Sequence, residues 1–428
     1  MFREKIHHLI AWKTKPNRKP LLVNGARQVG KSWLIRHFGN TNFTGKLVEI
    51  NLEKSKNLHR IFRPNFDLKR IVFELNLALN TSIVLGEDLL FIDEIQACPE
   101  ALGSLRYFYE EMPQLHLIVA GSLLDFEFRN QPFPVGRVEI MNLYPMTFLE
   151  FLKARNKNNL VQLLEMPFEN VPQNVEHYFE EDFMLYLIVG GMPECVKYFI
   201  ENNDLLGVKN IQNDLLYSYE QDFRKYQPTI NSDCLLDILE SATKFVGNQI
   251  IYTKLSQRFS SPTIKKGVDV LKTARLLYGI HNVSVSGLPL TVSGKQFKLF
   301  FLDVGLLLRK SNLDYQNLYI KRELSVAFQG MLSEQFVAQQ LIAQTEQKTY
   351  YWARTESGAS SEIDFVISND AKILPIEVKS GKSGSLKSLH YLLDKNPTIE
   401  RAIVFSHAKR GKLNTIEFIP IYWAGTIL

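Results

Sequence analysis

The feature that most constrains this chain is an eight-residue segment, GARQVGKS, at positions 25–32. It follows the apolar run Leu21–Val23 and precedes residues 33–38, which have the pattern of a helix. Glycines let the main chain approach a ligand closely, and successive backbone N–H groups at a helix N-terminus attract phosphate. The order of strand, loop and helix therefore predicts a P-loop that binds ATP or GTP.

The residue types of this loop predict their parts in nucleotide binding. Lys31 would lie between the terminal phosphates, and the Ser32 hydroxyl would bind Mg²⁺. The alternative is an ordinary glycine-containing turn before a helix. The expected nucleotide contacts are Gly25, Ala26, Arg27, Gln28, Val29, Gly30, Lys31, Ser32 and Trp33.

A second apolar run ends in two carboxylates, as the central strand of a P-loop protein would. Residues 89–92 are Leu-Leu-Phe-Ile, followed by Asp93 and Glu94. We expect Asp93 to hold the Mg²⁺ shell and Glu94 to polarise the attacking water as a catalytic residue. A strand that merely ends in acidic loop residues is the alternative.

Two further residues are weaker candidates for contacts to the nucleotide. Ser122 follows the apolar run 115–120 and could sense the γ-phosphate, although a Gly-Ser pair after a strand is also a common turn. Arg137 lies just beyond this region, where a phosphate contact and a surface arginine are both compatible with the sequence.

The length of 428 residues exceeds one typical core and predicts several domains. No apolar run approaches the roughly 20 residues that span a bilayer, so we expect a cytoplasmic protein without a membrane partner. The three cysteines are widely spaced, which argues against a disulfide framework or structural zinc. The expected parts are a P-loop ATPase domain at 1–160, a helical region with an acidic linker at 161–232, a winged helix at 233–312 and a nuclease-like domain at 313–428.

Basic residues concentrate between Lys244 and Lys298. This segment contains nine Lys or Arg residues and a single acidic residue, Asp269. The pattern predicts three helices and a hairpin that turns at Ser293-Gly294, which together would make a winged helix-turn-helix. Such a domain would bind the DNA backbone through residues 244–298. A helical bundle with a solvated basic face is the alternative. The third helix would carry Lys265, Lys266, Lys272 and Arg275, and the wing Lys295 and Lys298.

The last hundred residues carry a second candidate site. Two predicted strands bring Asp364 together with Glu377 and Lys379, and a helix upstream offers Glu334. Asp364 and Glu377 would hold Mg²⁺, and Lys379 would steady the attacking hydroxide. Residues 371–414 contain nine Lys or Arg and three acidic residues, and this basic segment is expected to contact the phosphate backbone of DNA. An ordinary salt bridge on an exposed strand is the alternative.

Taken together, these segments resemble a prokaryotic AAA+-like ATPase family. Its members join a P-loop domain to a winged helix and a C-terminal restriction-endonuclease-like domain of the PD-(D/E)xK type. The resemblance implies an α/β fold with a parallel P-loop sheet, binding of ATP and Mg²⁺, ATP hydrolysis and a role on DNA, while family members often lose the nuclease residues. It rests on residues 20–32, 91–96, 136–137, 143–148, 190–193, 301–306, 330–337, 362–365 and 376–379.

Three functions stay open at this point. The chain could be an ATPase that controls a Mg²⁺-dependent nuclease, or a nucleotide-controlled switch whose inactive nuclease fold docks DNA or a partner protein. A protein-remodelling ATPase is the third. Arg224 could act as an arginine finger, from the same chain or from another subunit of a homo-oligomer, or it could pair with Glu220.

Overall fold

The computed structural model of the chain separates into two compact units, Phe2–Tyr144 and Pro145–Leu428. The boundary therefore lies ahead of the expected one at residue 160. The described residues are 2–121, 136–226, 230–312, 326–344, 349–354, 361–379, 385–407 and 410–427.

The first unit is built on a sheet of five parallel strands in the order β2-β3-β4-β1-β5. Strands β1, β3 and β4 are buried along their whole length, as their continuous apolar sequences require of strands covered on both faces. All three strands were predicted. The bounds are β1 Leu21–Asn24, β2 Leu47–Asn51, β3 Leu89–Asp93, β4 His116–Gly121 and β5 Glu139–Asn142.

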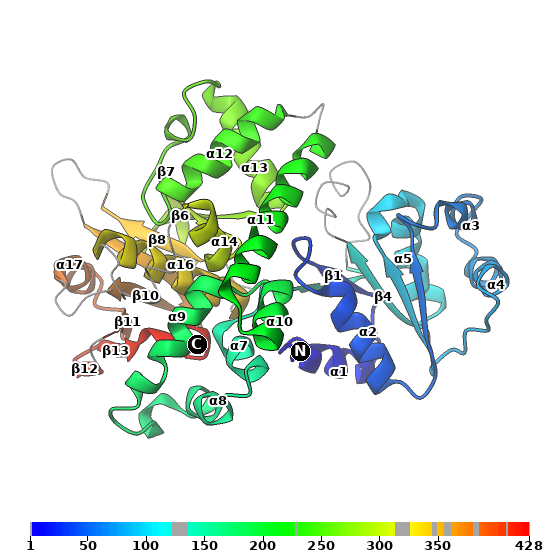
Figure 1. Cartoon of the computed structure of the whole chain (residues 1–428), viewed down its shortest axis with the longest axis horizontal. Helices are drawn as coiled ribbons and strands as arrows, with labels where there is room; N and C mark the ends of the chain where they lie inside the picture. The colour runs from blue at the N-terminus through cyan, green and yellow to red at the C-terminus, as the bar shows by residue number, and fades with distance from the viewer. Residues whose placement is uncertain are drawn as a thin grey trace. The chain divides into compact units, whose positions relative to one another are not determined.

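Helices lie on both sides of this sheet (Figure 1). Leu22, Leu90 and Val119 point into a core that α4 and α5 close. On α2, Gly39 lies close to Leu47 and Leu89. The helices are α1 Ile6–Thr14, α2 Lys31–Asn42, α3 His59–Phe62, α4 Leu68–Ala78 and α5 Pro99–Glu111, with short 3₁₀ turns η1 Lys56–Leu58 and η2 Ile95–Ala97. The result is a three-layer α/β unit.

The second unit begins with a group of helices. The acidic linker expected within 161–232 corresponds to residues 165–182, which contain the 3₁₀ turns η3 Phe168–Asn170 and η4 Glu176–Tyr178 and the first turn of α9. Arg410 ties this segment down by donating to the carbonyl oxygens of Phe168, Val171 and Pro172. The helices are α7 Phe148–Ala154, α8 Asn158–Glu165, α9 Glu180–Val189, α10 Pro193–Asn202 and α11 Leu205–Asp222, after which η5 spans Phe223–Tyr226.

The region expected to form a winged helix differs from the prediction in two places. Its second helix is only the 3₁₀ turn η6 Tyr252–Lys254, between α12 Ser232–Lys244 and α13 Ser261–Thr273. The hairpin pairs β6 Leu277–Ser284 with β7 Thr291–Phe301, so Ser293-Gly294 lies inside a strand. Gly294 has φ 78°, and the paired strand is bulged between His281 and Val283. A glycine that resembled a turn therefore marks an irregular strand.

This hairpin belongs to the same sheet as the C-terminal strands. The eight-stranded sheet has the order β12-β13-β11-β10-β9-β8-β6-β7, so β6 is bonded to β8 as well as to β7. Helix α16 contacts β7 and β10, and α17 contacts β9. The remaining bounds are α14 Val304–Lys310, α16 Val326–Gln344, α17 Lys387–Lys395, β8 Tyr350–Ala353, β9 Glu362–Asn369, β10 Lys372–Lys379, β11 Ala402–Ser406, β12 Gly411–Leu413, β13 Ile416–Pro420 and η7 Ile421–Gly425.

No helix among the described ranges combines the length and the apolar character needed to cross a bilayer.

Candidate functional site

The loop between β1 and α2 has the backbone shape that a phosphate cradle requires. Gln28 and Gly30 have φ of 63° and 92°, and α2 begins at Lys31 directly after Gly30. The Lys31 ammonium is buried and donates to the carbonyl oxygens of Gly25 and Ala26 at 2.9 and 2.7 Å. The lysine thus lies over its own loop, where a phosphate would meet it together with the backbone N–H groups.

Gly25 is required by close packing. A Cβ atom at this position would lie 2.3 Å from the carbonyl oxygen of Leu143, directly after β5. The opposite side of the loop is supported by Arg3, whose guanidinium donates to the carbonyl oxygens of Val29 at 2.8 Å and Tyr144 at 2.5 Å. Trp33 is 39% exposed and stacks on His37 with ring centroids 5.1 Å apart. The loop is therefore held in shape from both sides.

The two expected Mg²⁺ ligands are adjacent. The Ser32 hydroxyl donates to Asp93 Oδ2 at 2.8 Å, and the Asn51 amide approaches the same oxygen at 3.5 Å. Parallel strands β1 and β3 bring their carboxyl ends to one edge of the sheet, which explains how residues 61 positions apart meet. Hydroxyl and carboxylate oxygens are the donors that Mg²⁺ prefers, so this pair fits the ion.

Glu94 has an unusual backbone for a residue with a side chain. It lies in the left-handed region at φ 50° and ψ 47°, and its carboxylate accepts a hydrogen bond from Gln96 at 2.5 Å. Such conformations persist where the surrounding structure enforces them, often at functional sites. The backbone at the end of β3 thus presents the partly exposed carboxylate of Glu94.

Arg137 lies away from the phosphate loop, which favours the surface arginine over the phosphate contact among the two alternatives. Arg137 precedes Glu139, which pairs with Leu21 at the start of β1, whereas the loop follows the end of that strand. Its guanidinium donates to Glu110 at 2.9 Å and lies over Tyr109, both in the last turn of α5. The other weak candidate, Ser122, lies outside the described residues.

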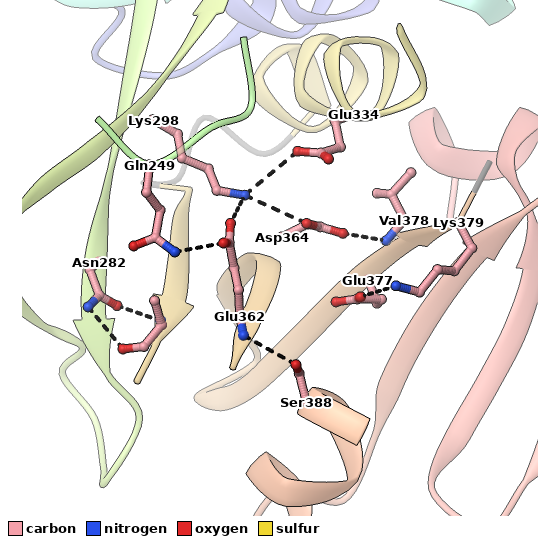
Figure 2. A network of polar contacts seen from close by, with 11 residues as sticks. Gln249, Asn282, Lys298, Glu334, Glu362, Asp364, Glu377, Val378, Lys379 and Ser388 are labelled. Carbon is pink, nitrogen blue, oxygen red and sulfur yellow. Dashed lines mark hydrogen bonds and ion pairs between the residues drawn. The ribbon is translucent and has the colours of Figure 1, made fainter. Parts of the chain in front are cut away.

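In the second unit, β9, β10 and α16 bring the four expected nuclease residues together (Figure 2). The backbone N–H of Val378 donates to Asp364 Oδ2 at 2.8 Å, and Lys379 donates to Glu377 at 2.5 Å. Glu334 comes from α16 and approaches the same cluster. The antiparallel pairing of Ile376 with Phe365 sets this register. Because α16 and the sheet cover the cluster, Glu377 is buried and does not lie on an exposed strand face.

Three residues that the sequence did not assign to this site complete it. Lys298 on β7 lies among three carboxylates, with its ammonium in an ion pair with Glu362 and 3.6 Å from Asp364 Oδ1 and 3.7 Å from Glu334 Oε2. The second oxygen of Glu362 accepts a hydrogen bond from Gln249 at 2.6 Å. No local pattern pointed to Lys298, because its partners lie at least 36 positions away in the sequence.

Burial and neighbouring negative charges raise the pKa values of the carboxyl groups in this cluster. Burial raises the pKa of Glu334 well above its usual range, with the charge of Asp364 adding to the effect. Burial also raises the pKa of Asp364, and it raises that of Glu377 to about 8 with a contribution from Asp364. Burial alone would lower the pKa of Lys298, but the surrounding carboxylates outweigh burial and raise it. Lys298 is therefore charged, and a further positive charge in the site would favour the ionised form of these carboxyl groups.

The carboxylate oxygens of the cluster are ligands that suit a hard cation. In the structure the ammonium of Lys298 lies among them. Buried oxygens of Glu334 and Glu377 have no hydrogen-bond partner among the described residues. In the same part of the chain, no three acidic, histidine or cysteine side chains converge as metal ligands would. Orphaned carboxylate oxygens suit a divalent ion.

The basic stretches expected to bind DNA are only partly free for a ligand. Lys298 is 1% exposed, so the expectation that it contacts a DNA backbone is wrong. Lys265, Lys266 and Lys295 are exposed. Several others have acidic partners inside the fold. These pairs are Lys244 with Glu240, Arg258 with Asp237, Lys372 with Glu400, and Arg401 and Lys412 with Glu417.

The alternatives for Arg224 also look different in the structure. Glu220, its suggested partner, accepts from Lys310 at 2.5 Å. Arg224 itself is exposed just after α11. Its role as an arginine finger stays a prediction.

Comparisons with known proteins agree with the geometry of the first unit. A family model described as an AAA domain matches residues 17–152. The chain contains an AAA-type P-loop ATPase domain. Two further models, both domains of unknown function (DUF8612 and DUF4143), match residues 180–317 and 329–423. A search of curated proteins found no match.

Solved structures similar to this chain include one protein of Pyrococcus abyssi and one of Aeropyrum pernix. The Walker-type ATPase PABY2304 of Pyrococcus abyssi is 18% identical with a TM-score of 0.47, covering 72% of this chain and 95% of that one. The ORC1 protein of Aeropyrum pernix, solved in complex with DNA, is 12% identical with a TM-score of 0.30, covering 76% of this chain and 95% of that one.

Proposed function

We propose that this chain is a Mg²⁺-dependent ATPase whose nucleotide state controls a DNA-binding, nuclease-like C-terminal half. The observation that carries the proposal is the presence, in one polypeptide, of an ATPase domain and a buried carboxylate–lysine cluster on β9, β10 and α16. Lys31 and residues 25–33 would hold the phosphates, Ser32 and Asp93 would hold Mg²⁺, and Glu94 would polarise the attacking water.

In the second unit, Asp364 and Glu377 would hold a divalent ion, with Glu334 as a third carboxylate. The buried Glu377 oxygen without a hydrogen-bond partner supports this assignment, whereas the corresponding Glu334 oxygen lies 3.7 Å from the Lys298 ammonium. A bound Mg²⁺ would supply a water of lowered pKa and stabilise the charge on phosphate. Lys379, held at 2.5 Å from Glu377, would steady the attacking hydroxide. Exposed Lys265, Lys266 and Lys295 would contact the DNA backbone.

A short covalent segment, residues 143–148, offers a route for the coupling between the two units. On the ATPase side, the Leu143 N–H donates to Asn24 at 2.7 Å, at the base of the P-loop. On the other side, the Met146 N–H donates to Gly191 at 2.6 Å and the Phe148 N–H donates to Gln340 of α16 at 3.0 Å. Helix α16 also carries Glu334. A change at the loop base would therefore act on a segment anchored to the helix of the carboxylate cluster.

The position of Lys298 favours a second candidate function. With an ammonium group among its carboxylates, the cluster could serve as a stable docking fold for DNA or a partner protein without cleaving DNA. In that case the chain would be a nucleotide-controlled binding switch.

Incubation with Mg²⁺ and a panel of duplex, single-stranded and branched DNAs separates these functions. Cleavage by the wild type that is lost in both Asp364→Asn and Lys379→Met supports the nuclease. Binding without cleavage supports the switch. ATP turnover measured on the same panel, with Lys31→Ala as the control, reports whether DNA and nucleotide act on each other. If no DNA changes ATP turnover, the proposed coupling between nucleotide and DNA is contradicted.

A further inference from the structure

The carboxylate cluster contains one lysine more than a nuclease-like site needs. Lys379 already occupies the lysine position of the Glu-x-Lys pair. Lys298 is buried against the other carboxylates of the cluster, Glu334, Glu362 and Asp364 (Figure 2). We infer that Lys298 is a built-in counter-cation that competes with a divalent metal ion for the carboxylates of the cluster. The inference deepens the proposed function and rests on it, because it concerns the same metal site.

The contacts of Lys298 are those of a resident cation. Its ammonium reaches Glu334, Glu362 and Asp364, which come from α16 and β9, and it also lies 5.4 Å from the centre of the Tyr351 ring. The side chain is 1% exposed. An ammonium so deeply buried is stable only when carboxylates surround it, and they in turn need a positive charge. Lys298 therefore provides the charge that a metal ion would otherwise provide.

The backbone holds this lysine in place from both sides. Phe297 bonds to Ile250 and Leu299 accepts from Gly247, so the segment 246–250 runs beside Lys298. At Gly247, which has φ 73°, a Cβ atom would lie 2.4 Å from Glu334 Oε2. From the same segment, Gln249 binds the far oxygen of Glu362. The backbone around Lys298 is thus fixed by the sheet, and its ammonium is not a surface charge.

Competition follows from the shared ligand. Asp364 is the proposed metal ligand, and its Oδ1 already faces Lys298 while its Oδ2 accepts from Val378. A dication beside an ammonium at this range would be repelled strongly in a buried site. Metal binding therefore requires the Lys298 side chain to withdraw from Asp364, and removing its charge favours the metal-bound form.

Isothermal titration of the full chain with MnCl₂, without nucleotide, tests the inference. We expect Lys298→Met to bind Mn²⁺ roughly tenfold more tightly than the wild type, since partial relief of repulsion in a buried site is of that order. Lys298→Arg keeps the charge and should bind Mn²⁺ no more tightly than the wild type. Adding Asp364→Asn to Lys298→Met should abolish the gain and so locate it at this cluster.

A double variant guards against misfolding. Removing one partner of a buried ion pair is strongly destabilising, whereas replacing both is tolerated better. If Lys298→Met does not fold, Lys298→Met with Glu362→Gln removes the pair as a unit and should show the same gain in Mn²⁺ affinity.

The outcomes distinguish this inference from the proposed function. Equal Mn²⁺ affinity in the wild type and the lysine variants, lost with Asp364→Asn, would overturn the inference and leave the proposed metal site standing. Tighter, Asp364-dependent binding in a variant that cleaves no DNA would support the inference and contradict the nuclease. Absence of Asp364-dependent binding in every protein would overturn both.

Discussion

The Ser32 hydroxyl donates a hydrogen bond of 2.8 Å to Asp93, which joins the first turn of α2 to the end of β3. This contact places the two expected Mg²⁺ ligands of the ATPase domain side by side. It also identifies the point at which a bound ion would link the P-loop to the neighbouring strand.

Removing either oxygen should therefore weaken the Mg²⁺-dependent part of nucleotide binding. We expect Ser32→Ala and Asp93→Asn to lower ATP turnover by about 10²-fold or more, because each removes a ligand that orients the metal and phosphates. Titration with ATP in Mg²⁺ and in EDTA measures the effect. If both variants keep the metal dependence of the wild type, this site does not hold Mg²⁺.

The position of Glu94 at the end of β3, in a left-handed backbone conformation, leads to a separate prediction. Glu94→Gln keeps the size of the side chain but removes the base, so ATP should still bind while hydrolysis falls by about 10²–10⁴-fold. Equilibrium binding and single-turnover hydrolysis are measured on the same protein. A variant that hydrolyses ATP at the wild-type rate would exclude Glu94 as the group that activates water.

Gly191 should be intolerant of a side chain because of the segment at 143–148. A Cβ atom there would lie 2.1 Å from the carbonyl oxygen of Met146. We expect Gly191→Ala to lower the free energy of unfolding by about 1–3 kcal/mol. Gly287→Ala is the matched control, since no atom lies within 4 Å of its Cβ position. Equal urea midpoints for the two variants would contradict this packing.

His407 should make the stability of the second unit sensitive to acid. It packs against Phe183 and Tyr422, and burial lowers its pKa from 6.5 to about 4. Between these values the unfolded chain binds a proton that the folded chain does not, so stability falls as pH falls from 6.5 to 4. Relative to His407→Gln, the wild type should lose about 2–3 kcal/mol over this range. Urea unfolding of both proteins at pH 7 and pH 4 measures this loss of stability. An equal loss in the wild type and in His407→Gln would contradict the assignment.

The parts of the fold that the sequence predicted correctly depend on local signals. The strand, glycine loop and helix around residues 21–38 follow from consecutive residues, as does the strand ending at Asp93. The strands at 362–369 and 372–379 follow from alternation and from turn-forming residues between them, although the turn lies at Asp370-Ala371 and not at Asn369-Asp370. In each case the residues that decide the structure are neighbours in the sequence.

The parts that failed depend on pairings between distant segments. Lys298 looked like a basic residue of an exposed wing, because nothing nearby shows that its strand joins the sheet of β8 and β9. For Arg137 the sequence left a phosphate contact and a surface position open. Because β5 runs parallel to β1, Arg137 lies at the edge of the sheet opposite the phosphate loop. Sheet order and register set both outcomes, and neither is encoded in a short window.

DNA affinity measured with and without ATP tests the central claim, that the nucleotide state of the P-loop controls the C-terminal half. At one fixed salt concentration, the Glu94→Gln protein with Mg²⁺ should bind its preferred DNA at least about fivefold differently when ATP is present. Lys31→Ala should show no such difference. Equal DNA affinity in both conditions, in Glu94→Gln protein shown to hold ATP, would contradict the account.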